Sequence, residues 1–227
     1  MTENRAVQQK SVRRNRVAAA ACVAAALIAV SVVGTRSATA DGAAPGTAVA
    51  AQPAAVTAPA PGLGSAALVQ SEDQVRQGLD PVGATVALTG RQGLSACSGE
   101  TTMRDLTKGA ATAYASVTWT LDTEGLLIES AASAPTGTAA DAWEQQLVSL
   151  VQDCQDEPAG HWYYGAAHTL TAAGGTARWY PSYNGDGAAG GGVAVLRSGT
   201  RVALVEVTGA AASVEGITTA ALKRLAS

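Results

Sequence analysis

Residues 193–207 have the sequence VAVLRSGTRVALVEV, and this stretch decides the fold class. Two β-rich runs, residues 193–197 and 201–207, flank the short sequence Ser-Gly-Thr, which favours a tight turn. The glycine triplet at residues 190–192 precedes the first run and interrupts any helical pattern. The stretch therefore predicts a β-hairpin and, with it, a sheet that contains antiparallel pairs.

Further β-rich segments precede this hairpin. Residues 114–121 and 125–132 flank a short polar connection and predict a second hairpin. The alternation at residues 84–89 predicts a strand before it. Residues 161–170 and 176–180 predict two more strands, joined by the turn-forming sequence Ala-Ala-Gly-Gly.

Three segments predict helices. Residues 138–154 repeat apolar side chains at helical spacing. Ser-Glu-Asp-Gln at residues 71–74 is a capping box that opens a short helix ending near Gly78, and residues 214–225 close the chain as a helix. The order of helix, three strands, helix, four strands and helix predicts an α+β fold, with a mostly antiparallel sheet and helices packed on it.

The first residues predict export. Residues 1–16 are basic, and the segment 17–34 contains a run without charge, which is typical of a transmembrane helix or a signal peptide. The length of the run and the position of Arg36 favour a single-pass anchor in the cell membrane with the C-terminal domain extracytoplasmic. Cleavage near Ala40, followed by secretion, is the alternative.

The remainder divides into a linker and a domain. Residues 35–64 are rich in Ala and Pro and lack large apolar side chains, so they predict a disordered linker. Residues 65–227 carry nine Lys and Arg against sixteen Asp and Glu, which gives this extracytoplasmic domain a net charge of −7. Electrostatic binding of nucleic acid needs a basic surface, so nucleic acid is excluded as a partner.

The cysteines predict one disulfide. Cys22 falls in the apolar segment, which leaves Cys97 and Cys154 in the exported domain, where the compartment is oxidising. A bond between them closes a loop of about 57 residues and stabilises the fold by on the order of 4 kcal/mol in the chain-entropy model.

The two histidines do not predict a metal site. His161 and His168 are seven residues apart in one expected strand, an odd offset that places them on opposite faces. Metal ligands must converge on one point, so no metal and no cofactor is expected. The sequence also lacks the G-x-S-x-G, S-x-x-K and H-E-x-x-H patterns of hydrolases, and no catalytic residue is assigned.

Aromatic residues cluster between positions 162 and 183, on two strands expected to pair. Because the chain has no Phe, these Trp and Tyr side chains are needed in the core, but alternation also sends some of them to the other face. Both interpretations stay open. If the domain binds a ligand, Tyr163, Trp179 and Tyr183 are the candidates, in a groove under the glycine-rich loop at residues 185–192.

The exported domain resembles the PknH-like extracellular sensor domain family of actinobacteria. The resemblance rests on the opening helix near residues 68–73, on Cys97, on the helix ending at Cys154, on Gly160-His161-Trp162 and on the hairpin at 193–207. It implies a mixed α/β sheet with a cleft and a role in sensing a ligand. The sequence departs from the kinase-borne form because it contains no kinase domain and is expected to form one disulfide where that form has two.

Two classes of function follow. The first is a membrane-tethered extracytoplasmic ligand-binding or sensor-like module without catalytic activity, held in the membrane through residues 17–34. Its ligand is an unknown small molecule or envelope component. The alternative is a secreted cell-envelope enzyme with an unrecognised site. The sequence shows no nucleophile paired with a base, which favours the first class.

Overall fold

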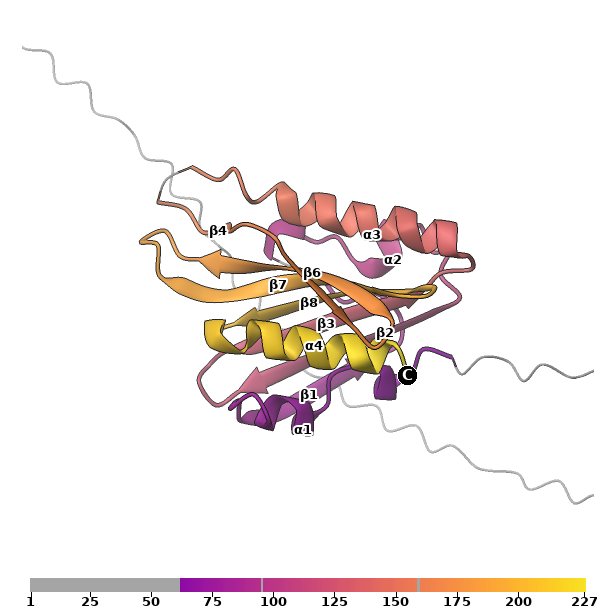
Figure 1. Ribbon diagram of the computed structural model, residues 1–227, viewed down its shortest axis with the longest axis horizontal. Helices are drawn as coiled ribbons and strands as arrows, with labels where there is room; N and C mark the ends of the chain where they lie inside the picture. Colours follow the sequence, from indigo (N-terminus) through magenta and orange to yellow (C-terminus); the bar gives the residue numbers. More distant parts are fainter. Residues whose placement is uncertain (1–61, 95, 159) are drawn as a thin grey trace, which may run out of the picture. The chain divides into compact units, whose positions relative to one another are not determined.

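The hairpin predicted at residues 193–207 lies within the sheet of the computed structural model, which describes residues 62–94, 96–158 and 160–227 (Figure 1). Strands β7 (Ala189–Ser198) and β8 (Arg201–Thr208) pair antiparallel, with Ser198 opposite Arg201. Gly199 lies between them with φ of 57°, a left-handed conformation that glycine adopts without a steric penalty. The predicted hairpin is therefore confirmed.

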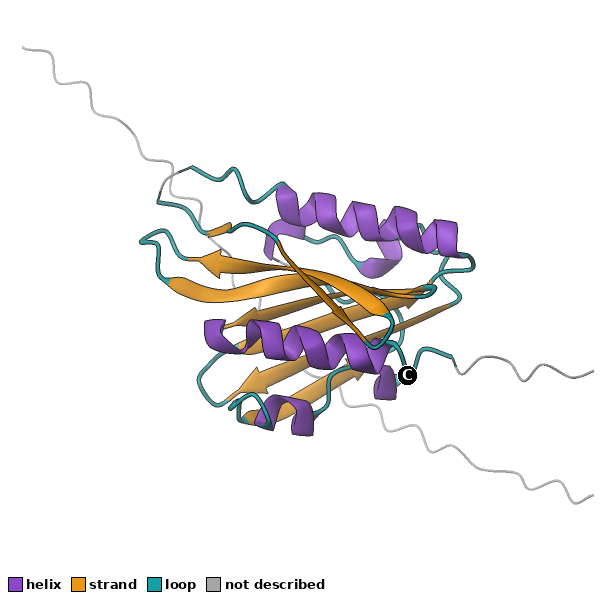
Figure 2. Cartoon of the chain, viewed as in Figure 1, coloured by secondary structure: helices purple, strands orange, loops and turns teal. Residues whose placement is uncertain are grey.

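Eight strands form one sheet, and every pair of neighbours is antiparallel. The order is β1-β2-β3-β8-β7-β6-β4, and β5 also pairs with β6. The remaining strands are β1 (Pro81–Ala87), β2 (Ala113–Leu121), β3 (Leu126–Ser133), β4 (Tyr163–Tyr164), β5 (His168–Ala172) and β6 (Gly175–Tyr183). Helices pack on this sheet, so the predicted α+β class is confirmed (Figure 2).

Each long helix covers one face of the sheet, because alternation along the strands supplies an apolar layer on both sides. Helix α3 (Gly137–Gln152) buries Trp143 and Leu147 in a core that includes Val193 and Val195. We call this side the α3 face. Helix α4 (Val214–Leu225) packs in a second core with the alternate strand residues, among them Ala194, Leu196, Ala203 and Val205. That side is the α4 face.

Two short helices complete the domain. On the α4 face, a 3-10 turn at Ser65–Ala67 leads into α1 (Ser71–Val75). The N-cap of α1 is Gln70, one residue before the expected Ser71, and the Gln70 N–H donates to the Asp73 carboxylate at 3.1 Å. Helix α2 (Met103–Leu106) belongs with the α3-face core through Met103 and was not predicted, because one turn is too short to show a periodic pattern.

The expected strand at 161–170 is divided in the structure. Tyr163–Tyr164 forms β4 and His168–Ala172 forms β5, so five strands follow α3 where four were expected. His161 lies before β4, outside any strand, and the argument from its odd offset to His168 was therefore wrong. The division falls at Gly165, whose N–H donates to the Pro181 carbonyl at 2.7 Å.

The glycine-rich stretch is also shorter as a loop than expected. Residues 189–192 belong to β7, and only residues 184–188 connect β6 to β7. Close packing explains the difference, because a Cβ atom on Gly191 would lie 1.9 Å from the Val207 carbonyl oxygen and one on Gly192 would lie 2.6 Å from the Tyr180 carbonyl oxygen. These glycines permit neighbouring strands to approach closely.

The predicted disulfide is confirmed. The sulfur atoms of Cys97 and Cys154 are 2.03 Å apart and their Cα atoms 5.9 Å. The bond ties the segment before α2 to the end of α3, and both cysteines pack against the α3-face core.

The predicted anchor or signal segment, residues 17–34, lies outside the described residues, as does nearly all of the linker at 35–64. Within the part of the chain that the structure describes, no helix has the length and apolar character needed to cross a membrane.

Candidate functional site

The three aromatic residues proposed from the sequence lie on β4 and β6, at one end of the sheet. Tyr163 and Tyr183 face each other across β4 and β6, with ring centroids 5.3 Å apart in a stacked arrangement. Trp179 stacks on the imidazole of His168, its partner on β5, at a centroid distance of 4.2 Å. The structure thus adds His168 to the set.

These rings share the α4 face of the sheet. Trp179 packs against the α4-face core. The residues next to Tyr163 and Trp179 on their strands, Tyr164 and Tyr180, point to the other side and are buried in the α3-face core. Gly165 lies between the two stacked pairs, and a Cβ atom there would come 2.7 Å from the Tyr183 ring and 3.0 Å from Pro181. We call this surface the aromatic strip; it comprises Tyr163, His168, Trp179, Pro181 and Tyr183.

The aromatic strip is partly accessible to solvent. Tyr163, Trp179 and Tyr183 are half-buried and His168 is exposed. By contrast, Trp162 contacts the buried Tyr164 in an edge-to-face arrangement at 4.5 Å and belongs with the α3-face core. The aromatic residues of this region therefore divide between core and surface, as alternation requires.

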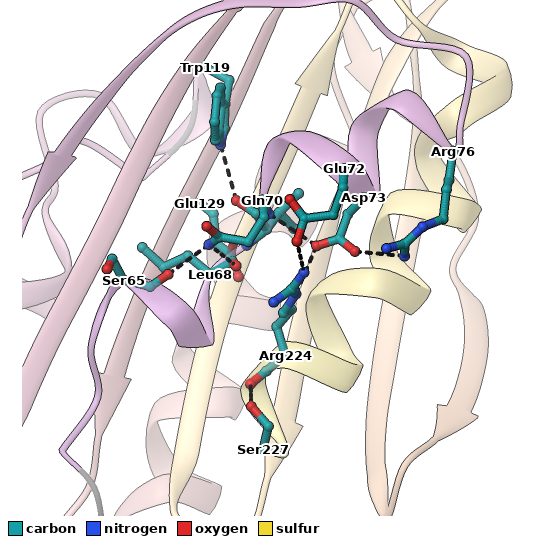
Figure 3. A network of polar contacts seen from close by, with 11 residues as sticks. Ser65, Leu68, Gln70, Glu72, Asp73, Arg76, Trp119, Glu129, Arg224 and Ser227 are labelled. Carbon is teal, nitrogen blue, oxygen red and sulfur yellow. Dashed lines mark hydrogen bonds and ion pairs between the residues drawn. The ribbon is translucent and has the colours of Figure 1, made fainter.

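A second region, which the sequence did not indicate, joins α1 to α4 (Figure 3). Asp73 is 4% exposed and accepts hydrogen bonds from Arg224 Nε at 2.8 Å and from Arg76 Nη1 at 3.0 Å. Arg224 also donates to Glu72 at 2.5 Å. Burial alone would raise the pKa of Asp73, but the hydrogen bonds from Arg224 and Gln70 outweigh it and hold that pKa below its usual value.

A cavity of about 510 Å³ opens beside this network. Its lining comes from α1 and the turn after it and from α4, and it includes Asp73, Arg76, Gln77, Thr219, Lys223 and Arg224. The cavity is open and charged, and Arg224 and Arg76 are already engaged by carboxylates of the protein.

Glu129 is a carboxyl group that lies fully buried in the sheet. It occupies β3 on the α4 face between Leu127 and Ala131 and is 0% exposed. Its Oε2 accepts a hydrogen bond from the Val69 N–H at 2.6 Å, and the Val69 carbonyl accepts one from Trp119 Nε1 at 3.1 Å. Glu129 therefore helps hold the segment before α1 on the sheet.

Burial raises the pKa of Glu129 to about 8. The Val69 N–H and Arg224 lower the pKa and Asp73 raises it, but these effects are smaller than the loss of solvent. The other carboxyl oxygen, Oε1, has no hydrogen-bond partner among the described residues. A sequence signal existed: Glu129 stands in the inward phase of an alternating strand, where a carboxyl group is rare.

The described residues show no group of three or more His, Cys, Asp and Glu side chains placed to hold a metal ion. His161 lies at the surface with its Nδ1 3.5 Å from Glu157 Oε2, and His168 stacks on Trp179. Chemically, the aromatic strip offers flat, partly apolar rings whose edges are polar.

Comparison with known proteins finds a structural likeness and no match by sequence. No model of a known protein family matches the chain, and no curated protein matches it by sequence. The structure is similar to the extracellular domain of PknH from Mycobacterium tuberculosis, with a TM-score of 0.46 and 16% sequence identity, over 71% of this chain and 92% of that chain. Membership of the PknH-like family stays a prediction.

Proposed function

We propose that residues 65–227 form an extracytoplasmic ligand-binding or sensor-like module without catalytic activity, and that the aromatic strip is its binding surface. In this proposal the segment at 17–34 tethers the domain to the membrane. The ligand is a small molecule or envelope component with a flat, partly apolar face, such as a sugar ring.

One observation carries the proposal: Tyr163 stacks on Tyr183 and Trp179 on His168 on one face of the sheet, and these rings stay partly accessible to solvent. Rings that are already stacked lose little conformational freedom when a ligand contacts them. Tyr and Trp also combine an apolar face with a polar edge, which suits a ligand that is itself amphipathic.

The location outside the cytoplasm has separate support. The bond between Cys97 and Cys154 is of the kind that persists in an oxidising compartment and is rare in the cytosol. It therefore agrees with the basic and apolar N-terminal segments, which predict export.

The test is a binding titration of the full-length chain with soluble peptidoglycan fragments and with chitotriose, followed by tryptophan fluorescence, since Trp179 lies in the aromatic strip. The variant Tyr183→Ala should lose binding and keep a melting temperature close to that of the wild type. Arg178→Ala is the matched control, because Arg178 is exposed on the same strand but is directed to the other face.

Two results would count against the proposal. Tyr183→Ala and Trp179→Ala proteins that both unfold would show that these rings belong to the core. Binding that persists in the folded Tyr183→Ala variant would place the site elsewhere, with the cavity between α1 and α4 as the next surface to probe.

A further inference from the structure

Strand β1 forms one end of the sheet, and within the described residues it pairs only with β2 (Figure 1). Residues 82–86 of this strand are all exposed, so the described residues leave the centre of β1 accessible to solvent, although α1 lies next to the strand. The outer edge of β1 therefore presents backbone N–H and C=O groups that are free to pair with another strand.

Exposed apolar side chains lie along this edge. Val82 is 66% exposed, Val86 49% and Leu88 59%, which places three of the five large exposed apolar residues of the domain on β1 or directly after it. No charged residue occurs between Asp80 and Arg91. Monomeric proteins commonly protect such edges with Lys or other charges, and this edge has only Pro81 and an irregularity near Gly83 at its beginning.

We propose that β1 pairs with β1 of a second copy of this chain, antiparallel, about a twofold axis perpendicular to the sheet. A strand is always antiparallel to its own image under this operation, so the pairing needs no other partner. The proposal does not depend on the function of the aromatic strip, which lies at the opposite end of the sheet.

The residue pattern fits one register well. A twofold axis perpendicular to the sheet keeps each face on its own side, so residues of the same face stand opposite each other. With Thr85 on the axis, Val86 lies opposite Ala84 of the second copy, a large side chain beside a small one. The same register brings Val82 near Leu88 of the second copy, which covers both exposed ends.

The lack of charge supports a second copy over a charged partner. A self-pairing edge cannot carry one charge without bringing it close to its own image, and none is present between Pro81 and Gly90. Pairing over one strand is a small interface, below the size of most permanent dimers, so the association is expected to depend on protein concentration.

Cysteine cross-linking of the full-length chain tests the register. The background carries Cys22→Ser, which removes the third cysteine and leaves the Cys97–Cys154 bond intact. Thr85→Cys in this background should form a disulfide-linked dimer under mild oxidation, because cross-strand pairs in either antiparallel position fall within reach of a disulfide. Leu126→Cys is the control, since Leu126 is an exposed apolar residue on β3, away from the β1 edge.

The proposal expects several-fold more dimer from Thr85→Cys than from Leu126→Cys on a non-reducing gel. Adding Val86→Lys should remove most of that dimer, because it places a charge in the apolar contact between the two strands. Val86 is half exposed, so its replacement leaves the core unchanged. Equal cross-linking of the two cysteine variants would show random collision and overturn the proposal. Dimer that persists with Val86→Lys would also overturn it, because the apolar contact would then contribute nothing.

Discussion

Replacing Glu129 by Gln should make the domain more stable at neutral and alkaline pH. Burial raises the pKa of Glu129 from 4.5 to about 8, so the folded protein keeps a proton that the unfolded chain releases. A raised pKa contributes stability that is fully present below pH 4.5 and is lost as the pH rises toward 8. The free energy of unfolding should therefore fall by about 1.4 kcal/mol per pH unit within this window.

The size of the effect follows from the shift. At pH 7, keeping Glu129 protonated costs the folded state roughly 3 kcal/mol relative to a carboxyl with an ordinary pKa. Domains are stable by only about 5–15 kcal/mol in total, so this is a large fraction. Glu129 is 0% exposed, so solvent does not screen its charge in the folded protein.

Gln is close in shape to a protonated Glu, and its carbonyl oxygen still accepts the Val69 N–H. The variant Glu129→Gln should therefore unfold at a higher denaturant concentration than the wild type at pH 8. The two proteins should differ little at pH 5, where Glu129 is protonated at small cost. Glu100→Gln, at an exposed position, is the matched control and should follow the wild type at every pH.

The assay is urea unfolding between pH 5 and 9 at constant ionic strength. The slope of the free energy of unfolding against urea concentration should be the same at each pH, so that a change in midpoint reports a change in stability. The neighbouring carboxyl group of Asp73 does not contribute to the pH dependence between pH 5 and 9, because its pKa is lowered and it titrates below this range. Parallel pH profiles for the wild type and Glu129→Gln would refute the reasoning, because they would show that Glu129 does not titrate between the folded and unfolded states in this range.

Two further predictions concern the bonds that join the elements. Arg224→Ala should lower the free energy of unfolding by about 1–3 kcal/mol, because it leaves the buried Asp73 carboxylate with one cation fewer; Lys223→Ala, next to it on α4, is the control and should change stability little. Because the pKa of Asp73 is lowered, the stability it contributes is present above its ordinary pKa of 3.8 and is lost at lower pH, so the difference between Arg224→Ala and the wild type should shrink in acid. Replacing both Cys97 and Cys154 by Ser should cost about 2–4 kcal/mol in the same urea assay, and an unchanged midpoint would show that the bond adds nothing to stability.

Local patterns predicted most of the secondary structure. The hairpin of β7 and β8, the pair β2–β3 and helices α3 and α4 were all expected within a few residues of their bounds. Each of these elements is long enough to show its own period of two or of three to four residues, and that period depends on which face is buried. The disulfide was also predicted, since only two cysteines remained for an oxidising compartment.

Short elements and exact divisions were not predictable in this way. Helix α2 has a single turn, and the break between β4 and β5 depends on a hydrogen bond from Gly165 to Pro181 on another strand. The sequence also placed Tyr163, Trp179 and Tyr183 as candidates without showing that they share a face. That followed from the pairing of β4 and β5 with β6, which is a contact between segments separated along the chain.

The sequence by itself determined the α+β class, the disulfide and the prediction of export, because these depend on composition and on periods within single segments. Only the tertiary structure decided which partners the buried carboxyl groups have. Glu129 lies beneath Val69, 60 residues away in the chain, and Asp73 meets Arg224 across 151 residues. The free edge of β1 likewise depends on the order of strands in the sheet. The energies of these groups are set by neighbours from distant segments, which remove water and supply partners, and no local pattern encodes them.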